Sequence, residues 1–254
     1  MSKSRNRKSS SSSKPRSNSN RRSNAELTRY PSIDGPNGVG AEAIGQPCIA
    51  VKKYDGSNLQ FSWNQSDGWY RYGTRRRTVR PDNPLFGNAI ELFQNKYATG
   101  IIEAVRKYKE YRNTKSLTAF CEFYGEKTFS GLHVDEDPKE IKLFDIMLDD
   151  SNLVLPADFK HHFGHLDIAE IVFEGELTKT FITQVRAGEV VAGEGVVAKG
   201  VKTTARRKGK SERTAWMVKI KTQDWLDELA RRAGASPDKF DTELQDNQRQ
   251  QNLA

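Results

Sequence analysis

A lysine followed closely by an acid and a glycine is the feature of this chain best suited to chemistry. Lys53 ends a predicted strand over residues 47–53 and opens the run Lys53-Tyr54-Asp55-Gly56. A lysine becomes a nucleophile when burial or a neighbouring cation, such as Lys52, lowers its pKa, and it then bonds to a phosphorus or carbonyl centre. The pattern Lys-x-Asp-Gly arises by chance in roughly one of twenty chains of this length, so a surface lysine before a turn is the alternative.

Two acids and a further lysine, later in the chain, lie in short sequence patterns that could also serve chemistry. Glu122 stands in an apolar predicted strand over residues 116–124, where an acid on the exposed face is the plain alternative. Glu194 opens and Lys199 closes the run Glu-Gly-Val-Val-Ala-Lys, for which an ion pair across a turn is the alternative.

Two lysines, an aromatic residue and an arginine complete the set. Lys219 and Lys221 lie in a predicted strand over residues 215–221. Phe144 lies in an apolar predicted strand over residues 141–148 and is either a stacking surface or a core residue. Arg75 opens a run of three arginines that is alternatively a solvated basic face.

Taken in order, these segments resemble the covalent nucleotidyltransferases, which comprise ATP-dependent DNA ligases, RNA ligases and mRNA capping enzymes. The resemblance covers about residues 28–222. Within that superfamily the chain resembles most the RNA ligase 2 family, through Tyr30-Pro31-Ser32-Ile33, Asn58 two residues after Gly56, and Arg75 followed by Pro81 and Leu85-Phe86-Gly87. The segments that match the superfamily motifs are residues 53–56, 120–125, 144–146, 194–199 and 219–221.

The resemblance implies a mechanism and a role for each lysine. Lys53 attacks the α-phosphate of ATP, expels pyrophosphate and becomes lysyl-AMP; the AMP then passes to a 5′-phosphate end, and a 3′-hydroxyl displaces it. Lys219 and Lys221 contact the phosphates and offset the charge that develops there. Glu194 acts near the metal or the lysine, and the expected metal is Mg²⁺, with Mn²⁺ as a substitute.

The remaining roles concern the nucleotide and the nucleic acid. By the same resemblance, Glu122 binds the ribose hydroxyls, Phe144 stacks on adenine, and Lys199 belongs to the nucleotide-binding set. Arg75 touches a phosphate or the nucleic-acid end. A basic connector over residues 202–213 is either a solvated loop or a track for a phosphate backbone, through Arg206, Arg207 and Lys208.

The sequence pattern predicts an α+β fold, and the resemblance implies a nucleotidyltransferase (ATP-grasp-like ligase) domain over residues 25–235, with antiparallel sheets flanked by helices around a nucleotide cleft. Alternation predicts strands at 47–53, 58–64, 69–75, 116–124, 141–148, 195–199 and 215–221. Three- and four-residue spacing predicts a long helix at about 85–111, shorter helices at 156–166 and 179–188, and a last helix capped by Thr222.

The net positive charge is concentrated at the N-terminal end of the chain. Residues 1–24 hold eight Lys or Arg and no acid, which equals the net charge of +8 of all 254 residues. Such a segment lacks aromatic and branched apolar residues and is expected to be disordered and to tether nucleic acid. Two cysteines indicate an intracellular, reduced protein, and no apolar run approaches the ~18 residues of a membrane span. A cytoplasmic location is expected, in the host if a phage or virus encodes the chain.

Only 33 residues follow Lys221, and residues 236–254 are a polar tail, so no second domain is expected. A protein partner or self-association would then replace the surface that such a domain supplies in the superfamily. The sequence therefore favours an ATP-dependent polynucleotide ligase, with RNA favoured over DNA. The alternatives are a DNA ligase, a GTP-dependent capping guanylyltransferase, and a non-catalytic nucleic-acid-binding protein on the same fold.

Overall fold

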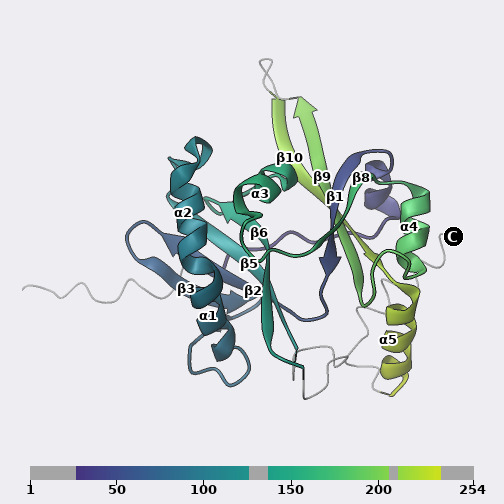
Figure 1. The fold of residues 1–254 in the computed structure, drawn as a ribbon, viewed down its shortest axis with the longest axis horizontal. Helices are drawn as coiled ribbons and strands as arrows, with labels where there is room; N and C mark the ends of the chain where they lie inside the picture. The colour runs from purple at the N-terminus through teal and green to yellow at the C-terminus, as the bar shows by residue number, and fades with distance from the viewer. Residues whose placement is uncertain (1–26, 126–136, 206–210, 236–254) are drawn as a thin grey trace, which may run out of the picture.

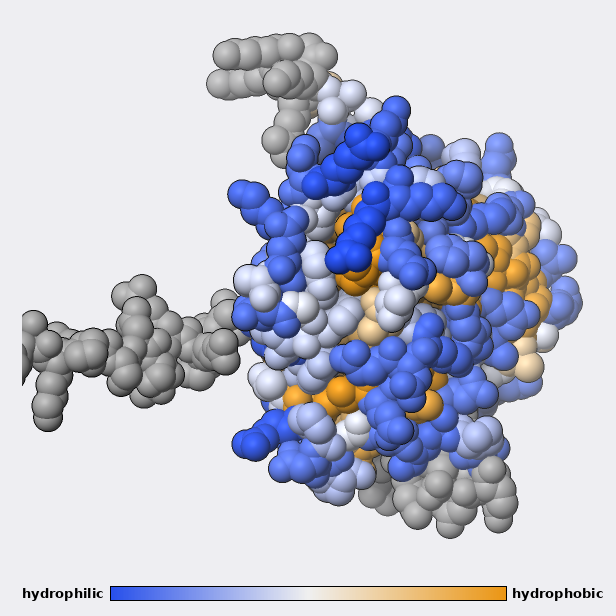
Figure 2. All heavy atoms as spheres, turned by 60° about the vertical axis from the view of Figure 1, so that its left-hand side comes forward, coloured by the Kyte–Doolittle hydropathy of each residue, from blue (hydrophilic) through white to orange (hydrophobic). Residues whose placement is uncertain are grey.

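Two antiparallel β-sheets lie side by side with helices on their outer faces (Figure 1). The structure is a computed structural model that describes residues 27–125, 137–205 and 211–235. The two predicted tails and the basic residues Arg206, Arg207 and Lys208 lie outside these residues. The side on which β3, α1 and α2 lie is mostly hydrophilic, with separate apolar patches (Figure 2).

The first sheet, called sheet A, has four strands in the order β10-β9-β1-β8. All its neighbours pair antiparallel. Its strands are β1 (Pro47–Lys53), β8 (Ile171–Glu176), β9 (Gly195–Ala205) and β10 (Ser211–Lys221). The hairpin of β9 and β10 extends beyond the body of the molecule (Figure 1).

The second sheet, called sheet B, has six strands in the order β4-β3-β2-β5-β6-β7, also antiparallel throughout. Its strands are β2 (Ser57–Asn64), β3 (Gly68–Thr74), β4 (Thr78–Val79), β5 (Ser116–Tyr124), β6 (Glu140–Leu148) and β7 (Asn152–Leu153). The α+β architecture of antiparallel sheets with flanking helices is as predicted.

Each sheet buries an apolar face under helices, because alternate side chains of a strand point to opposite faces. Sheet A packs against α4 (Lys179–Arg186) and the 3₁₀ turn η1 (Gly38–Ala43). Sheet B packs against α1 (Gly87–Phe93), the π-helical turn η2 (Gln94–Ala98), α2 (Thr99–Lys107) and α3 (Pro156–Phe163). The 3₁₀ turn η3 (Lys109–Tyr111) follows α2, and α5 (Gln223–Ala235) ends the described chain.

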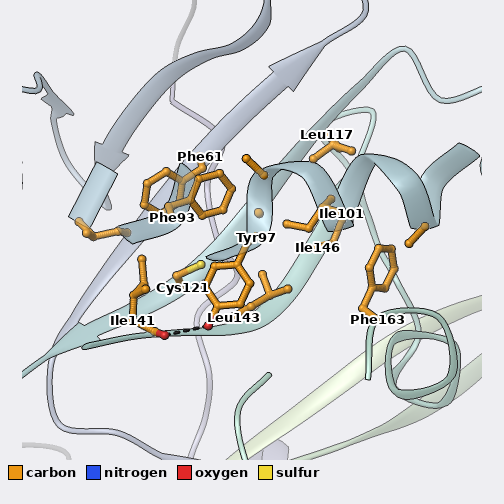
Figure 3. Packing of buried hydrophobic residues seen from close by; sticks show 14 of the residues in the cluster. Phe61, Phe93, Tyr97, Ile101, Leu117, Cys121, Ile141, Leu143, Ile146 and Phe163 are labelled. Atoms are coloured by element: carbon orange, nitrogen blue, oxygen red, sulfur yellow. Dashed lines mark hydrogen bonds between the residues drawn. The ribbon is translucent and has the colours of Figure 1, made fainter. Parts of the chain in front are cut away.

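The core of sheet B is aromatic at its centre (Figure 3). The rings of Phe61 and Phe93 stack with centroids 3.9 Å apart, and the Tyr97 hydroxyl donates to the Ile141 carbonyl at 2.8 Å. That hydrogen bond lets a phenol sit in the core without an unsatisfied polar group. The faces of the two sheets that look toward each other, called the inner faces, carry charged residues beside smaller apolar clusters.

The strand predictions are confirmed to within a residue or two for β1, β2, β3, β5 and β6. The long predicted helix is continuous but contains the π turn η2. The prediction of a loop over residues 202–213 is wrong in part, because residues 202–205 extend β9 and residues 211–213 extend β10. Strand β8 was not predicted. Within the described residues, no helix is both long and apolar enough to cross a membrane.

Candidate active site

The strand register brings the first and last of the predicted lysines, Lys53 and Lys221, together on the inner face of sheet A. Lys53 on β1 and Lys221 on β10 both pair with Gly195, which lies on the central strand β9. Directly paired residues in an antiparallel sheet point to the same face, so the two lysines flank the glycine. Lys219 lies two residues further along β10 on the same face, opposite Val197.

A single carboxylate joins the two lysines. The Oε1 atom of Glu194 lies 2.7 Å from Nζ of Lys53 and 3.6 Å from Nζ of Lys221. The side chains of Glu194 and Lys221 are 6 % and 2 % exposed, whereas that of Lys53 is 25 % exposed. The group therefore consists of a buried anion and a buried cation with a second, accessible amine at the rim.

Gly195 is required between the lysines. Its φ of +138° lies in a region that L side chains rarely adopt. A Cβ at this position would lie 2.0 Å from the Ile220 carbonyl oxygen. The absence of a side chain lets β9 and β10 approach closely and leaves the space between Lys53 and Lys221 to the Glu194 carboxylate.

Glu122 approaches from the opposite sheet. It lies on β5, paired with Asn58 of β2, on the inner face of sheet B. Burial raises the pKa of its carboxyl from 4.5 to about 8; Lys53 and a hydrogen bond from the Gly56 backbone lower it, while Glu194 and Asp55 raise it. These influences show that Glu122 shares an electrostatic environment with the Lys53 cluster.

Gly56 makes that approach feasible. A Cβ there would lie 2.4 Å from the Phe123 carbonyl oxygen, so any side chain would push β2 away from β5. The glycine of the Lys-x-Asp-Gly motif thus has a steric role, since it lets the chain pass from Lys53 on sheet A to Asn58 on sheet B beside Glu122.

Burial also raises the pKa of the Glu194 carboxyl, while Lys53 and then Lys221 lower it. Burial outweighs both cations because a desolvated carboxylate loses more hydration than two nearby charges replace. The site therefore gathers three acids (Glu122, Glu194 and Asp55) around cations on sheet A.

A second lysine–carboxylate pair, Lys199 with Asp145, connects the inner faces of the two sheets further along the strands. Nζ of Lys199 lies 2.8 Å from Oδ2 of Asp145 and donates to the Phe144 carbonyl at 2.7 Å. The Tyr30 hydroxyl also donates to Oδ2 of Asp145 and lies 3.1 Å from Sδ of Met217. This cluster links both sheets to the N-terminal segment.

The ring of Phe144 is held by the same cluster. It lies edge-on to Tyr30 at 5.3 Å, stacks on Phe120 at 6.4 Å and has Nζ of Lys199 5.5 Å from its centroid. Phe144 is also packed beside Val197 and Val51 on the inner face of sheet A. An apolar wall between the sheets thus lies next to the charged group.

The last two predicted site residues differ in accessibility. Lys219 is partly buried, and its backbone N–H donates to the Asp34 carbonyl at 2.9 Å. Arg75 is exposed in the turn that follows β3. Of the predicted residues described, Lys53, Lys199, Lys219 and Lys221 share the inner face of sheet A. Glu194 contacts Lys53 and Lys221, Glu122 lies on the inner face of sheet B, and Arg75 lies at the edge of that sheet.

Several residues around the site were not assigned a role from the sequence. Asp145 accepts hydrogen bonds from both Lys199 and Tyr30. The signals in the sequence were a polar residue within an apolar strand and a tyrosine in the Tyr-Pro-Ser-Ile segment. Trp225 makes a cation–π contact with Lys221, and the Lys221 Nζ lies 4.1 Å from the centroid of the Trp225 ring. Thr222 caps α5 as predicted, through the Trp225 N–H, and also donates to the Gly193 carbonyl beside Glu194.

The donor set fits a metal that arrives with phosphates. Among the described residues there is no group of three or more His, Cys, Asp or Glu side chains placed to hold an ion. Mg²⁺ usually takes one or two carboxylates and completes its shell with water and substrate phosphates. Glu194 could supply an oxygen ligand of that kind.

Two large surface hollows lie elsewhere. One of about 750 Å³ runs between α3 and β8, and one of about 650 Å³ lies between η1, β10 and the N-terminal segment. Neither is lined by Lys53, Glu122 or Glu194. The chemistry of the side chains, not the size of a hollow, identifies the site.

Comparison with solved structures places this geometry in a known fold. No family model matches the chain, and no curated protein matches it in sequence. The chain matches structures of Naegleria gruberi RNA ligase, including a lysine mutant with ATP and Mn (17 % identity, TM-score 0.54) and the ligase with PPi (18 %, 0.54). Each match covers 80 % of this chain and 58 % of that one.

The chain has the fold of an RNA ligase nucleotidyltransferase. At these identities the likeness concerns the fold, and the chain spans a little over half the length of those ligases. The predicted α+β nucleotidyltransferase fold is confirmed; membership of the RNA ligase 2 family stays a prediction.

Proposed function

We propose that the chain is an ATP-dependent nucleotidyltransferase that forms lysyl-AMP at Lys53 and passes the AMP to a polynucleotide end, as an RNA ligase does. The observation that carries the proposal is the contact of an accessible lysine amine with the buried Glu194, beside Lys221 and opposite Glu122. A binding module needs no accessible amine held against a buried carboxylate.

In the first step the Nζ of Lys53 attacks the α-phosphorus of ATP. An N–P bond forms, the bond from the α-phosphorus to the bridging oxygen breaks, pyrophosphate leaves, and the amine loses a proton. Lys219 and Lys221 would offset the negative charge on the phosphates as it develops. Mg²⁺ or Mn²⁺, held by Glu194 and the phosphates, would neutralise further charge when bound.

The adenosine would occupy the space between the sheets. Glu122 would bind the ribose hydroxyls, and Phe144 would stack on adenine. Lys199 would act through Phe144, since it donates to the Phe144 carbonyl and lies against its ring. Arg75, at the edge of sheet B, would contact the phosphate or the nucleic-acid end.

The second step transfers the AMP from Lys53 to the polynucleotide, and the third step joins the two ends. A terminal 5′-phosphate oxygen attacks the AMP phosphorus and releases the lysine, which gives a 5′-adenylylated end. A 3′-hydroxyl then attacks the 5′-phosphate, so that a phosphodiester forms and AMP is released. RNA is the proposed substrate because the matched structures are RNA ligases.

The test uses the full chain with Mn²⁺ or Mg²⁺ and either ATP or GTP radiolabelled at the α-phosphate. Label from ATP should stay on the protein in a denaturing gel and should vanish in Lys53→Ala. Label from GTP alone would favour a capping guanylyltransferase over this proposal. Labelled protein that seals nicks only with DNA strands would overturn the RNA assignment, while leaving the lysyl-AMP step intact.

A further inference from the structure

The first turn of α5 lies directly after the end of β10, because a single residue joins them. Lys221 ends β10, and α5 begins at Gln223. Oγ1 of Thr222 accepts from the Trp225 N–H at 3.3 Å, and the Thr222 carbonyl accepts from the Leu226 N–H at 3.2 Å. Such a cap satisfies the free N–H groups of the first helical turn and fixes how the chain enters the helix. The cap therefore sets the position of Trp225 relative to Lys221.

The same threonine ties this turn to the segment that carries the carboxylate of the site. The Thr222 N–H donates to the Glu194 carbonyl at 3.1 Å, and its hydroxyl donates to the Gly193 carbonyl at 2.6 Å. Lys221, which precedes Thr222, pairs with Gly195 in the strand register. Glu194, Lys221 and the first turn of α5 are thus held together as one unit by the backbone.

Within this unit the ring of Trp225 lies against the ammonium of Lys221. Nζ of Lys221 is 4.1 Å from the ring centroid, whereas the contacts of Lys52, Lys107 and Lys199 with tyrosine or phenylalanine rings measure 5.3 to 5.5 Å. Tryptophan is the best aromatic partner for a cation, and the attraction is larger when the pair is removed from water. Trp225 is 7 % exposed and the Lys221 side chain 2 %, so this pair is largely desolvated.

The carboxylate of Glu194 lies closer to the other lysine. Its Oε1 is 2.7 Å from Nζ of Lys53 but 3.6 Å from Nζ of Lys221, which exceeds the length of a hydrogen bond. A lysine carries a point charge on a flexible four-carbon stem, so a long ion pair restricts its direction little. The ring of Trp225 adds a short contact from a residue whose backbone is fixed by the cap.

We propose that Trp225 is a positioning residue, whose ring holds the Lys221 ammonium where it meets the phosphates of the bound nucleotide. The part that concerns the phosphates rests on the proposed function, whereas the hold of the ring on Lys221 does not. Trp225 acts through Lys221 and not on the reacting atoms. Loss of one group that stabilises developing charge costs about 10²–10³ in rate, and a displaced Lys221 loses part of that effect.

The test compares the rate of self-labelling from saturating ATP among variants of the full chain. Trp225→Leu should lower this rate about tenfold, which is the effect of one desolvated cation–π contact. Trp225→Phe should keep most of the rate, because phenylalanine also presents a ring face to the cation. Trp225→Leu/Lys221→Met should label as slowly as Lys221→Met and no more slowly, because the ring acts through the lysine.

Leu229→Ala is the matched control, since it removes another buried side chain of α5 and keeps the ring. It should label at the wild-type rate even where its midpoint of urea unfolding falls. Equal losses of rate in Leu229→Ala and Trp225→Leu would show that Trp225 only supports α5, and would overturn the proposal. A further loss in the double variant, beyond that of Lys221→Met, would overturn it as well.

Nuclear magnetic resonance separates this inference from the proposed function. In protein labelled with ¹³C at the lysine Cε, the Lys221 signal is the one missing from Lys221→Met. Protons above an aromatic ring are shielded, so the Lys221 ε-protons should resonate upfield of those of exposed lysines and move downfield in Trp225→Leu. These shifts in a wild type that takes no label would contradict the proposed function and support the hold of Trp225 on Lys221. Unshifted Lys221 signals in the wild type would overturn the inference, whether or not the protein labels.

Discussion

Two lysines on the inner face of sheet A, Lys53 and Lys199, each pair with a carboxylate, and the two pairs differ in accessibility. Lys199 and Asp145 are each 6 % exposed, and Asp145 is also held by Tyr30. Lys53 is 25 % exposed, although its partner Glu194 is buried. The same pair of residue types therefore forms a closed link in one place and leaves a reachable amine in the other.

The difference shows what each group does for the molecule. The Lys199 group joins sheet A, sheet B and the segment at Tyr30, so it fixes how the inner faces meet. The Lys53 group leaves one amine at the rim, which a nucleophile requires. Disruption of the first group should lower stability, and disruption of the second should lower activity.

Lys199→Met gives the largest expected loss of stability. It leaves Asp145 as a buried carboxylate without its cation, which costs about 3–5 kcal/mol in the free energy of unfolding. Urea unfolding followed by circular dichroism measures the loss. Lys53→Met should cost much less, because Glu194 keeps Lys221. Asp145→Leu/Lys199→Met should recover most of the stability, and equal losses in Lys53→Met and Lys199→Met would contradict the comparison.

Glu194→Gln tests activity at the other group. Without the carboxylate 2.7 Å from Nζ of Lys53, the amine loses its fixed position, and misplacement of a reacting group by about 1 Å costs roughly a hundredfold in rate. The rate of self-labelling from ATP measures this effect. Labelling of Glu194→Gln at the wild-type rate would show that Glu194 does not position Lys53.

Tyr30→Phe removes one donor from the closed group. A hydrogen bond to a charged acceptor contributes about 1.5–3 kcal/mol, so the free energy of unfolding should fall by that amount. Tyr70→Phe, at a tyrosine that is 41 % exposed, is the matched control and should be neutral. Equal stability of the two variants would mean that Tyr30 does not secure Asp145.

A pH dependence of the stability is expected from Glu122. Burial raises the pKa of its carboxyl from 4.5 to about 8, so between these values the folded state holds a proton that the unfolded state has released. Stability from this group is present below pH 4.5 and is lost as pH rises toward 8. Unfolding of wild type and Glu122→Gln across this range should show a shallower decline in the variant; parallel curves would contradict the shifted pKa.

The sequence predicted most of the strands because their alternation follows the period of two. Strand β8 was missed, since Glu174, Gly175 and Glu176 interrupt the apolar pattern and β8 is defined by pairing with β1. The charged motif residues could be named from their spacing. The role of Asp145 could not, because its partners Tyr30 and Lys199 lie 115 and 54 residues away along the chain.

Peptide mapping of the adenylylated protein tests the central claim most directly. Lys52 and Lys53 are adjacent, but register places Lys53 on the inner face and Lys52, opposite Val196, on the other. After incubation with ATP and Mn²⁺, mass spectrometry should find AMP on Lys53, should find it still in Lys52→Arg, and should find none in Lys53→Arg. AMP on Lys52 or another lysine, with Lys53 unmodified, would contradict the account.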